Sequence, residues 1–261
     1  MRNLIFALAL MGLPVYGAAD WHLVWSDEFN GASQTPPDVN KWKYDLGDGG
    51  WGNQELEVYT DQRENVFQDG EGHLVIRAIK TASGGFTSAR MKTQGKFAIR
   101  YGKIEARMKI PFGQGMWPAF WMLGGDIESA GWPNCGEIDV MENIGKEPAI
   151  VHGTVHGPGY SGGKGISAQY ALQGAPPLAA DFHVYGVEWS PQAIEFFLDG
   201  ISYAKVTPAS LPQGAKWVFD HPFFLLLNVA VGGAWPGNPD ASTTFPQSML
   251  VDWVRVWQRG K

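Results

Sequence analysis

The chain has 261 residues, which is enough for one large domain or two small ones. Its 34 glycines and 17 prolines, with 44% hydrophobic residues and 12 tryptophans, are typical of a packed, aromatic-rich globular protein and exclude disorder, collagen and coiled coil. The net charge is −6, and no lysine- or arginine-rich run offers the positive surface that phosphate backbones require, so we expect no nucleic-acid partner. Cys135 is the single cysteine, which excludes an internal disulfide and a cysteine-based zinc site.

The N-terminus has the pattern of a secretory signal peptide. Residues 1–3 carry a positive charge, residues 4–13 form a nearly unbroken apolar run, and residues 17–19 are small enough for cleavage. A membrane anchor needs about 20 apolar residues, and this run is shorter. We therefore expect residues 1–19 to be removed and residues 20–261 to form one domain that is secreted, extracellular or periplasmic, and free of the membrane.

Alternation of apolar and polar residues predicts strands along most of the chain. Two stretches place every second, apolar residue on one face: Leu74, Ile76 and Ala78 in the first, and Ile104, Ala106, Met108 and Ile110 in the second. Asp199-Gly200 separates two β-rich runs, 194–198 and 201–206, and this dipeptide is a strong hairpin signal.

Two later stretches are also expected to be strands. Residues 223–231 form an apolar run interrupted by Asn228, which indicates a strand buried on both faces, and residues 251–257 are rich in valine and tryptophan. We find no amphipathic helix of twelve or more residues, and expect at most short helical turns near Ala171 or Leu211. Many short strands without interleaved helices favour an all-β sandwich or barrel.

The acidic residues of the segment 136–143 carry the strongest chemical signal. In a regular strand Glu137 and Asp139 would share one face, whereas Glu142 would point to the other face among aliphatic neighbours. Burial of an unpaired carboxylate is costly. We therefore predict a β-bulge at residues 140–141, which adds one residue and returns Glu142 to the face of the other two acids.

Three carboxylates on one face suit the hydrolysis of glycosidic bonds. That reaction needs one group to attack the anomeric carbon and one to protonate the leaving oxygen, while Asp139 between them would help to keep their protonation states different. A solvated acidic edge strand, or a cation site built from carboxylates, remains open on this pattern alone. Trp117, Trp121 and Trp132 flank the acids, however, and indole rings are platforms for the apolar faces of sugars.

These residues resemble glycoside hydrolase family 16, and within it the laminarinase-type endo-β-1,3-glucanases. The resemblance covers nearly all of residues 20–261 and is carried by ordered blocks at 25–31, 50–55, 87–90, 113–121, 131–133, 136–143, 230–237 and 251–256. It implies a concanavalin A-like jelly-roll β-sandwich of two antiparallel sheets, with a substrate cleft across the concave sheet.

The resemblance also implies roles for the three acids. Glu137 corresponds to the nucleophile, Asp139 to its hydrogen-bonding assistant and Glu142 to the acid/base. The five-residue spacing from Glu137 to Glu142 matters, because the family members called lichenases have one residue fewer. The implied activity is that of a secreted, retaining endo-β-1,3-glucanase that acts on β-glucan polysaccharides or oligosaccharides as a monomer, without a catalytic cofactor.

Further residues match the family's substrate contacts: Asn53, Arg90, Trp117, Trp121, Trp132, His156 and Trp235. We expect His156 to follow on the next strand and to reach Glu142, where a hydrogen-bond donor would tune the pKa of the acid. Cys135, by contrast, is expected to be a small buried hydrophobe.

The resemblance further implies a structural Ca²⁺ ion on the convex side, away from the cleft. Asp252 would supply a carboxylate, and Glu28 and Gly72 would supply carbonyl or side-chain oxygens, which is a ligand set suited to this cation.

Other functions on the same scaffold are a non-catalytic β-glucan-binding protein, a mixed-linkage β-1,3-1,4-glucanase and an enzyme that acts on an algal galactan. Both catalytic glutamates are present, which disfavours a protein that only binds glucan. No basic cluster for sulfated sugars is evident in the sequence, which disfavours a galactan enzyme.

Overall fold

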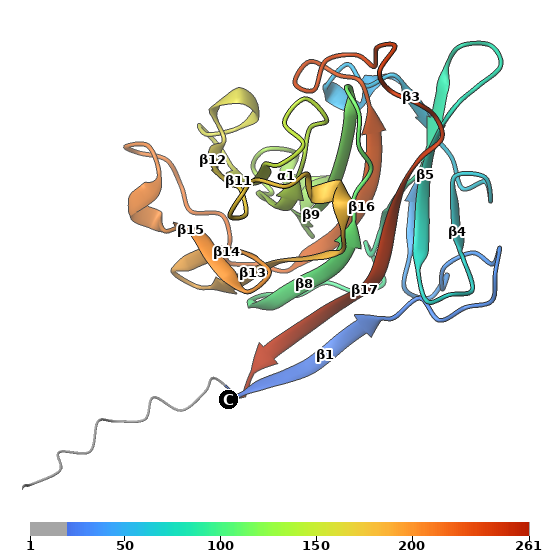
Figure 1. The fold of residues 1–261 in the computed structure, drawn as a ribbon. Coiled ribbons are helices and arrows are strands. Elements are labelled where there is room, and N and C mark those ends of the chain that lie inside the picture. Colours follow the sequence, from blue (N-terminus) through green and yellow to red (C-terminus); the bar gives the residue numbers. More distant parts are fainter. Residues whose placement is uncertain (1–19, 261) are drawn as a thin grey trace, which may run out of the picture.

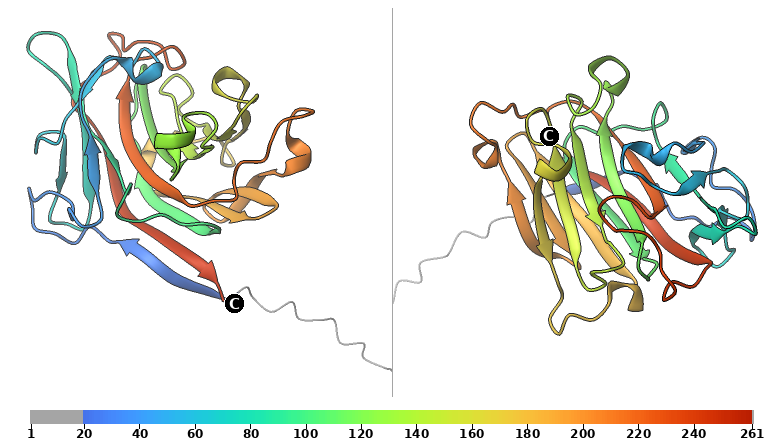
Figure 2. Two further views of the ribbon diagram at one scale, coloured as in Figure 1. Left: turned by 180° about the vertical axis from the view of Figure 1, so that it is seen from behind. Right: turned by 90° about the horizontal axis from the view of Figure 1, so that it is seen from above.

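The computed structural model describes residues 20–260, and in it two β-sheets pack face to face (Figures 1 and 2). The expected signal peptide, residues 1–19, lies outside the described residues. One sheet has ten strands and the other has seven. The expectation of an all-β sandwich is confirmed.

The larger sheet follows the order β15 (Ile201–Val206), β14 (Ala193–Leu198), β13 (His183–Ser190), β8 (Gly102–Lys109), β17 (Gln247–Arg259), β5 (Leu74–Lys80), β6 (Phe86–Ser88) and β3 (Glu57–Tyr59). In addition, β1 (Trp21–Asp27) pairs with β17, and β4 (Val66–Gln68) pairs with β5. The smaller sheet follows the order β12 (Ile166–Tyr170), β11 (Val151–His156), β10 (Glu137–Glu142), β9 (Met116–Gly124), β16 (Phe223–Val231), β7 (Arg90–Lys92) and β2 (Lys43–Asp45). Among the described strands, β3 and β6 pair in parallel and the other pairs are antiparallel.

Helical structure in the described residues is limited to single turns. These are α1 (Ile127–Ala130) and the 3₁₀ turns η1 (Gly50–Gly52), η2 (Gly162–Lys164), η3 (Leu178–Ala180) and η4 (Pro208–Ser210). The turn η4 matches the one expected near Leu211, but the expectation near Ala171 is wrong, since that residue is not helical and the next turn begins at Leu178. None of the described helices is long and apolar enough to cross a membrane.

The predicted alternation is clearest in β8. Ile104, Ala106 and Met108 are fully buried in the core between the sheets, whereas the intervening residues are only partly buried. The hairpin prediction is also confirmed, because Asp199 and Gly200 join β14 to β15 with positive φ angles of 50° and 77°. Such angles belong to the two-residue turns whose twist matches that of the strands they connect.

Both faces of β16 are covered, as the apolar run predicts. Phe223, Leu225 and Leu227 belong to the core between the sheets. Phe224 and Leu226 join a second, smaller cluster on the other face, which includes the buried Cys135 and packs against α1. The short helix, which the sequence analysis missed, therefore shields part of the sheet surface that also carries the acids.

Gly153 of β11 lets the two sheets approach closely behind the acidic strand. A Cβ atom at Gly153 would lie 2.5 Å from a ring carbon of Phe196 and 2.6 Å from the hydroxyl oxygen of Tyr203, both in the opposite sheet. There is thus no room for even one methyl group at this position.

We expect Gly153→Ala to lower the free energy of unfolding by about 1–3 kcal/mol, since overpacking must displace these rings. Gly163→Ala is the control, because a Cβ at Gly163 would meet no atom within 4 Å. Urea unfolding followed by tryptophan fluorescence measures both variants. Equal midpoints for the two variants would contradict the close packing.

Candidate active site

A β-bulge in β10 brings the three acids onto one face of the smaller sheet. Along β9, Glu137 is paired with Leu123, Asp139 with Trp121 and Glu142 with Ala119, which are alternate residues of one strand face. The register shifts between Asp139 and Glu142 against both neighbouring strands. The two bulge residues, Val140 and Met141, are both fully buried. The predicted bulge is therefore confirmed at its predicted position.

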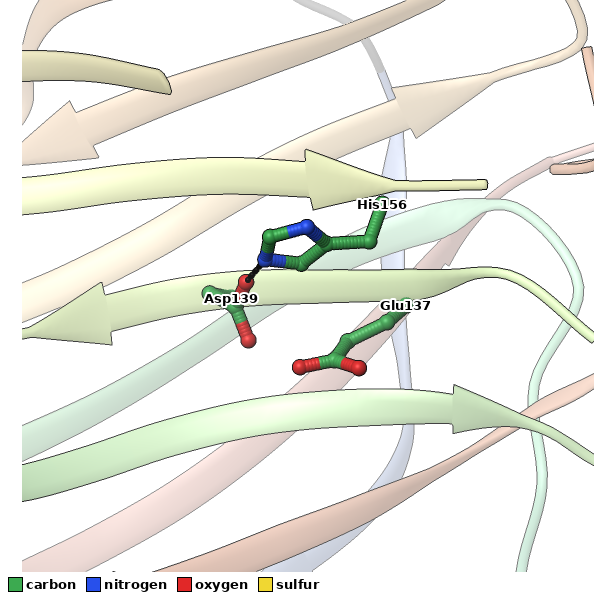
Figure 3. A group of neighbouring side chains, drawn as sticks. All are labelled: Glu137, Asp139 and His156. Carbon is green, nitrogen blue, oxygen red and sulfur yellow. Dashed lines mark ion pairs between the residues drawn. The ribbon is translucent and has the colours of Figure 1, made fainter. Parts of the chain in front are cut away.

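Each carboxylate has a separate partner. The indole Nε1–H of Trp132 donates to Glu137 (2.5 Å), and that of Trp117 donates to Glu142 (2.9 Å). His156 Nε2 lies 3.1 Å from Asp139 Oδ2 (Figure 3). A carboxylate oxygen of Glu137, one of Asp139 and a ring nitrogen of His156 lie within 4.8 Å of one another. This spacing could also hold a metal cation.

Burial is the main electrostatic influence on the acids. It raises the pKa of Glu142 to about 8, with a contribution from Glu137, while the Trp117 N–H opposes the rise. Burial, followed by the charge of Asp139, raises the pKa of Glu137 well above its usual range, and His156 and Trp132 oppose this rise. Glu142 therefore holds a proton at neutral pH, and burial also acts against the ionised form of Glu137, which His156 and Trp132 stabilise.

The pKa of Asp139 is raised by its burial and by the charge of Glu142, and His156 opposes the rise. Burial also acts against a charge on His156 itself, but the hydrogen bond and charge of Asp139, with the charge of Glu137, outweigh it and raise the pKa of His156. The His156 imidazolium and the acids thus stabilise one another's charged forms.

The expectation that His156 reaches Glu142 is wrong. β11 runs antiparallel to β10 with His156 opposite Glu137 and His152 opposite Glu142. His156 consequently lies at the Glu137 end of the acidic strand and pairs with Asp139. The hydrogen-bond donor at Glu142 is Trp117 instead.

Aromatic rings surround the acids on the same face. Trp117 meets Trp235 edge to face, with ring centroids 5.5 Å apart, and the backbone carbonyl of Trp235 accepts a hydrogen bond from Lys146 Nζ (2.8 Å). Trp132 leaves 48% of its surface exposed, and its ring centroid is 6.2 Å from that of His156. Exposed indoles beside acids offer stacking surfaces for sugar rings.

Arg90 occupies a position between two indoles farther along the sheet. Its guanidinium carbon lies 4.7 Å from the ring centroid of Trp121 and 4.8 Å from that of Trp51, and its Nε is 3.0 Å from Asp45. Asn53, directly after η1, donates its amide to Glu55 (3.0 Å). Trp51 and Glu55 were not among the residues expected from the sequence, although both lie within the block 50–55.

The three residues expected to bind calcium lie on or near the larger sheet. Glu28 accepts two hydrogen bonds from Arg255 (3.0 and 2.8 Å), and Asp252 accepts one from Arg107 (2.6 Å). Both carboxylates are thus neutralised by arginines, an arrangement that fits a cation poorly unless an arginine moves away. Gly72 offers only its backbone carbonyl. The calcium site stays a prediction.

Comparisons with known proteins agree with this site. Residues 52–255 match the model of the glycosyl hydrolases family 16. The chain is 42% identical to a β-glucanase of Rhodothermus marinus, over 99% of this chain and 95% of that protein, and 34% identical to a glucan endo-1,3-beta-glucosidase of Cryptopygus antarcticus, over 95% and 96%. The crystal structure of the laminarinase catalytic domain from Thermotoga maritima is similar with a TM-score of 0.86 and 50% identity, over 93% of this chain and 100% of that one.

We expect Trp117→Phe to raise the pKa of Glu142 above about 8, by roughly 0.5–1.5 units, because the lost indole N–H stabilises the ionised carboxylate. A ¹³C NMR titration of protein labelled at glutamate carboxyl carbons measures the shift. Trp257→Phe, in the opposite sheet, is the control. A pKa that stays in place or falls in Trp117→Phe would show that this bond does not tune Glu142.

We expect a chelator to lower the melting temperature by several degrees if calcium is bound as predicted, and to leave low-temperature activity intact because the three residues lie away from the acids. Differential scanning calorimetry with EDTA and with added Ca²⁺ measures this effect. Asp252→Asn should abolish the difference between the two conditions. An identical melting temperature with and without EDTA in the unmodified protein would argue against the site.

Proposed function

Because this chain belongs to family 16 of the glycosyl hydrolases, we propose that it is a secreted endo-β-1,3-glucanase that cleaves internal bonds of β-1,3-glucans with retention of configuration. The observation that carries the proposal is the bulged strand β10, which presents Glu137 and Glu142 on one face with different hydrogen-bond partners. The glucanase and laminarinase relatives support the substrate class. The signal-like residues 1–19 support secretion.

In the first chemical step, protonated Glu142 gives its proton to the oxygen of the bond to be cleaved, and the Glu137 carboxylate attacks the anomeric carbon. The bond between that carbon and the leaving oxygen breaks, and an ester between Glu137 and the sugar forms with inversion. A pKa of Glu142 of about 8 supports the role of general acid, since the group still holds its proton at neutral pH.

In the second step, the ionised Glu142 takes a proton from a water molecule, and the water oxygen attacks the same anomeric carbon. The bond to Glu137 breaks and its carboxylate returns. Two inversions give a product with the original β-configuration. Asp139 and His156 lie beside Glu137, where a charge on His156 stabilises the Glu137 carboxylate and a charge on Asp139 opposes it.

We expect laminarin to be cut into oligosaccharides of mixed length whose reducing ends are β-anomers in the earliest proton NMR spectra. Parallel reactions with curdlan, lichenan and agarose define the linkage preference. Release of α-anomers first would exclude retention. Binding of laminarin without any release of reducing sugar would favour the glucan-binding alternative instead.

We expect azide to distinguish the two glutamates. In Glu137→Ala, azide attacks in place of the missing nucleophile and gives an α-glycosyl azide by one inversion. In Glu142→Ala, an activated substrate still forms the ester with Glu137, because a good leaving group needs no proton, and azide then gives the β-glycosyl azide. The opposite product assignments would exchange the two roles, and undiminished laminarin hydrolysis in both variants would exclude β10 as the catalytic strand.

A further inference from the structure

A line of hydrogen bonds runs from the smaller sheet, through Tyr59 of β3 in the larger sheet, to a buried carboxylate. Trp121 Nε1 donates to Asn228 Oδ1 (2.8 Å), Asn228 Nδ2 donates to the hydroxyl oxygen of Tyr59 (3.1 Å), and the Tyr59 hydroxyl donates to Glu55 Oε2 (2.9 Å). The other oxygen, Glu55 Oε1, accepts the amide of Asn53 (3.0 Å). We call these five residues the Glu55 relay.

The two ends of the relay determine the direction of every bond in it. An indole N–H can only donate, and an ionised carboxylate can only accept. The oxygen of the Asn228 amide therefore faces Trp121, and the hydroxyl hydrogen of Tyr59 points to Glu55. Glu55 thus accepts one hydrogen bond at each oxygen, from Tyr59 and from Asn53.

A second buried acid, Glu57, lies next to the relay. Glu57 is 1% exposed, and one of its oxygens accepts the backbone N–H of Val231 (2.6 Å), while its Oε1 has no partner among residues 20–260. Burial, and then the charge of Glu55, raises the pKa of Glu57 to about 9. Glu57 is therefore neutral at neutral pH.

Both ends of the relay lie at residues that match substrate contacts of the family. Trp121 is paired in register with Asp139, so its indole lies on the face that carries the acids, and Arg90 covers its ring. The backbone carbonyl of Asn53 accepts the N–H of Ala234, which precedes Trp235. Glu55 thus holds Asn53 directly and is linked through Tyr59 and Asn228 to Trp121, on the face that carries the acids.

We propose that Glu55 is a positioning residue for glucan binding, which orients Asn53 directly and Trp121 through Tyr59 and Asn228. The proposal rests on the proposed glucanase function. Because the relay ends at the binding surface rather than at Glu137 or Glu142, its loss weakens substrate binding and leaves the acid–base chemistry unchanged.

Tyr59→Phe is the first test, because it keeps the buried ring and removes only the hydroxyl in the middle of the relay. We expect KM for laminarin to rise about 5- to 20-fold, kcat to stay within about 2-fold, and both limbs of the pH profile to stay in place. Tyr160→Phe is the matched control, since the Tyr160 hydroxyl is also buried and donates to the carbonyl of Lys216 (2.9 Å). That variant should leave KM unchanged.

A double-mutant cycle tests whether Tyr59 acts through Trp121. Trp121→Phe removes the indole N–H that donates to Asn228, which is the first bond between Trp121 and Tyr59. Adding Tyr59→Phe to this variant should therefore raise KM no more than about 2-fold further. Independent, multiplying effects of the two substitutions would overturn the proposal. An unchanged KM in Tyr59→Phe with a lowered melting temperature would also overturn it, because the hydroxyl would then serve stability alone.

Glu55→Gln provides a variant of nearly identical shape, in which an NH₂ group replaces one acceptor of the relay. In ¹H–¹⁵N NMR spectra the indole signal of Trp121, assigned by its absence in Trp121→Phe, should shift in Glu55→Gln and in Tyr59→Phe but not in Tyr160→Phe. An unmoved indole signal in both relay variants would overturn the positioning role, whatever the substrate. Failure of the unmodified protein to hydrolyse laminarin would contradict the proposed function alone.

Discussion

The free-energy cost of burying a carboxylate determines the conformation of the acidic strand, on which the candidate active site depends. β10 lies inside the smaller sheet, with one face against the core and the other carrying the acids, so a regular strand that placed Glu137 correctly would drive Glu142 into the core. The bulge sends Val140 and Met141 to the core in succession and returns Glu142 to the open face. Even there Asp139 and Glu142 are buried, and burial raises the pKa of Glu142 and provides the protonated acid that hydrolysis requires.

The sequence predicted those features that depend on local pattern. Three such features are the alternation in β8, the Asp199-Gly200 hairpin and the bulge in β10. Each depends on apolar, acidic or turn residues that lie within about ten residues of one another in the sequence. The partner of His156 was predicted wrongly because it depends on the register between β10 and β11, which is set by the loop between them. A shift of a few residues along β11 decides which acid a histidine meets.

The Glu55 relay could not be predicted from local pattern, because the two bonds of Asn228 join distant parts of the chain. Tyr59 and Asn228 are 169 positions apart, and Trp121 and Asn228 are 107 apart. The one available signal was Asn228 itself, a polar residue within an apolar strand that must find partners when buried. The arginine partners of Glu28 and Asp252 likewise depend on strand pairing in the larger sheet, which links Arg255 and Arg107 to them.

The pairing of β1 with β17 brings the two ends of the described chain together. Trp21 lies opposite Arg259, and both strands extend beyond the body of the sandwich at the foot of Figure 1, on the sheet opposite the acids. A short peptide could join these ends, and a new opening could be made in an exposed turn such as the one at Gly200. The fold is thus suited to circular permutation, and a second module fused at either end would emerge away from the acids.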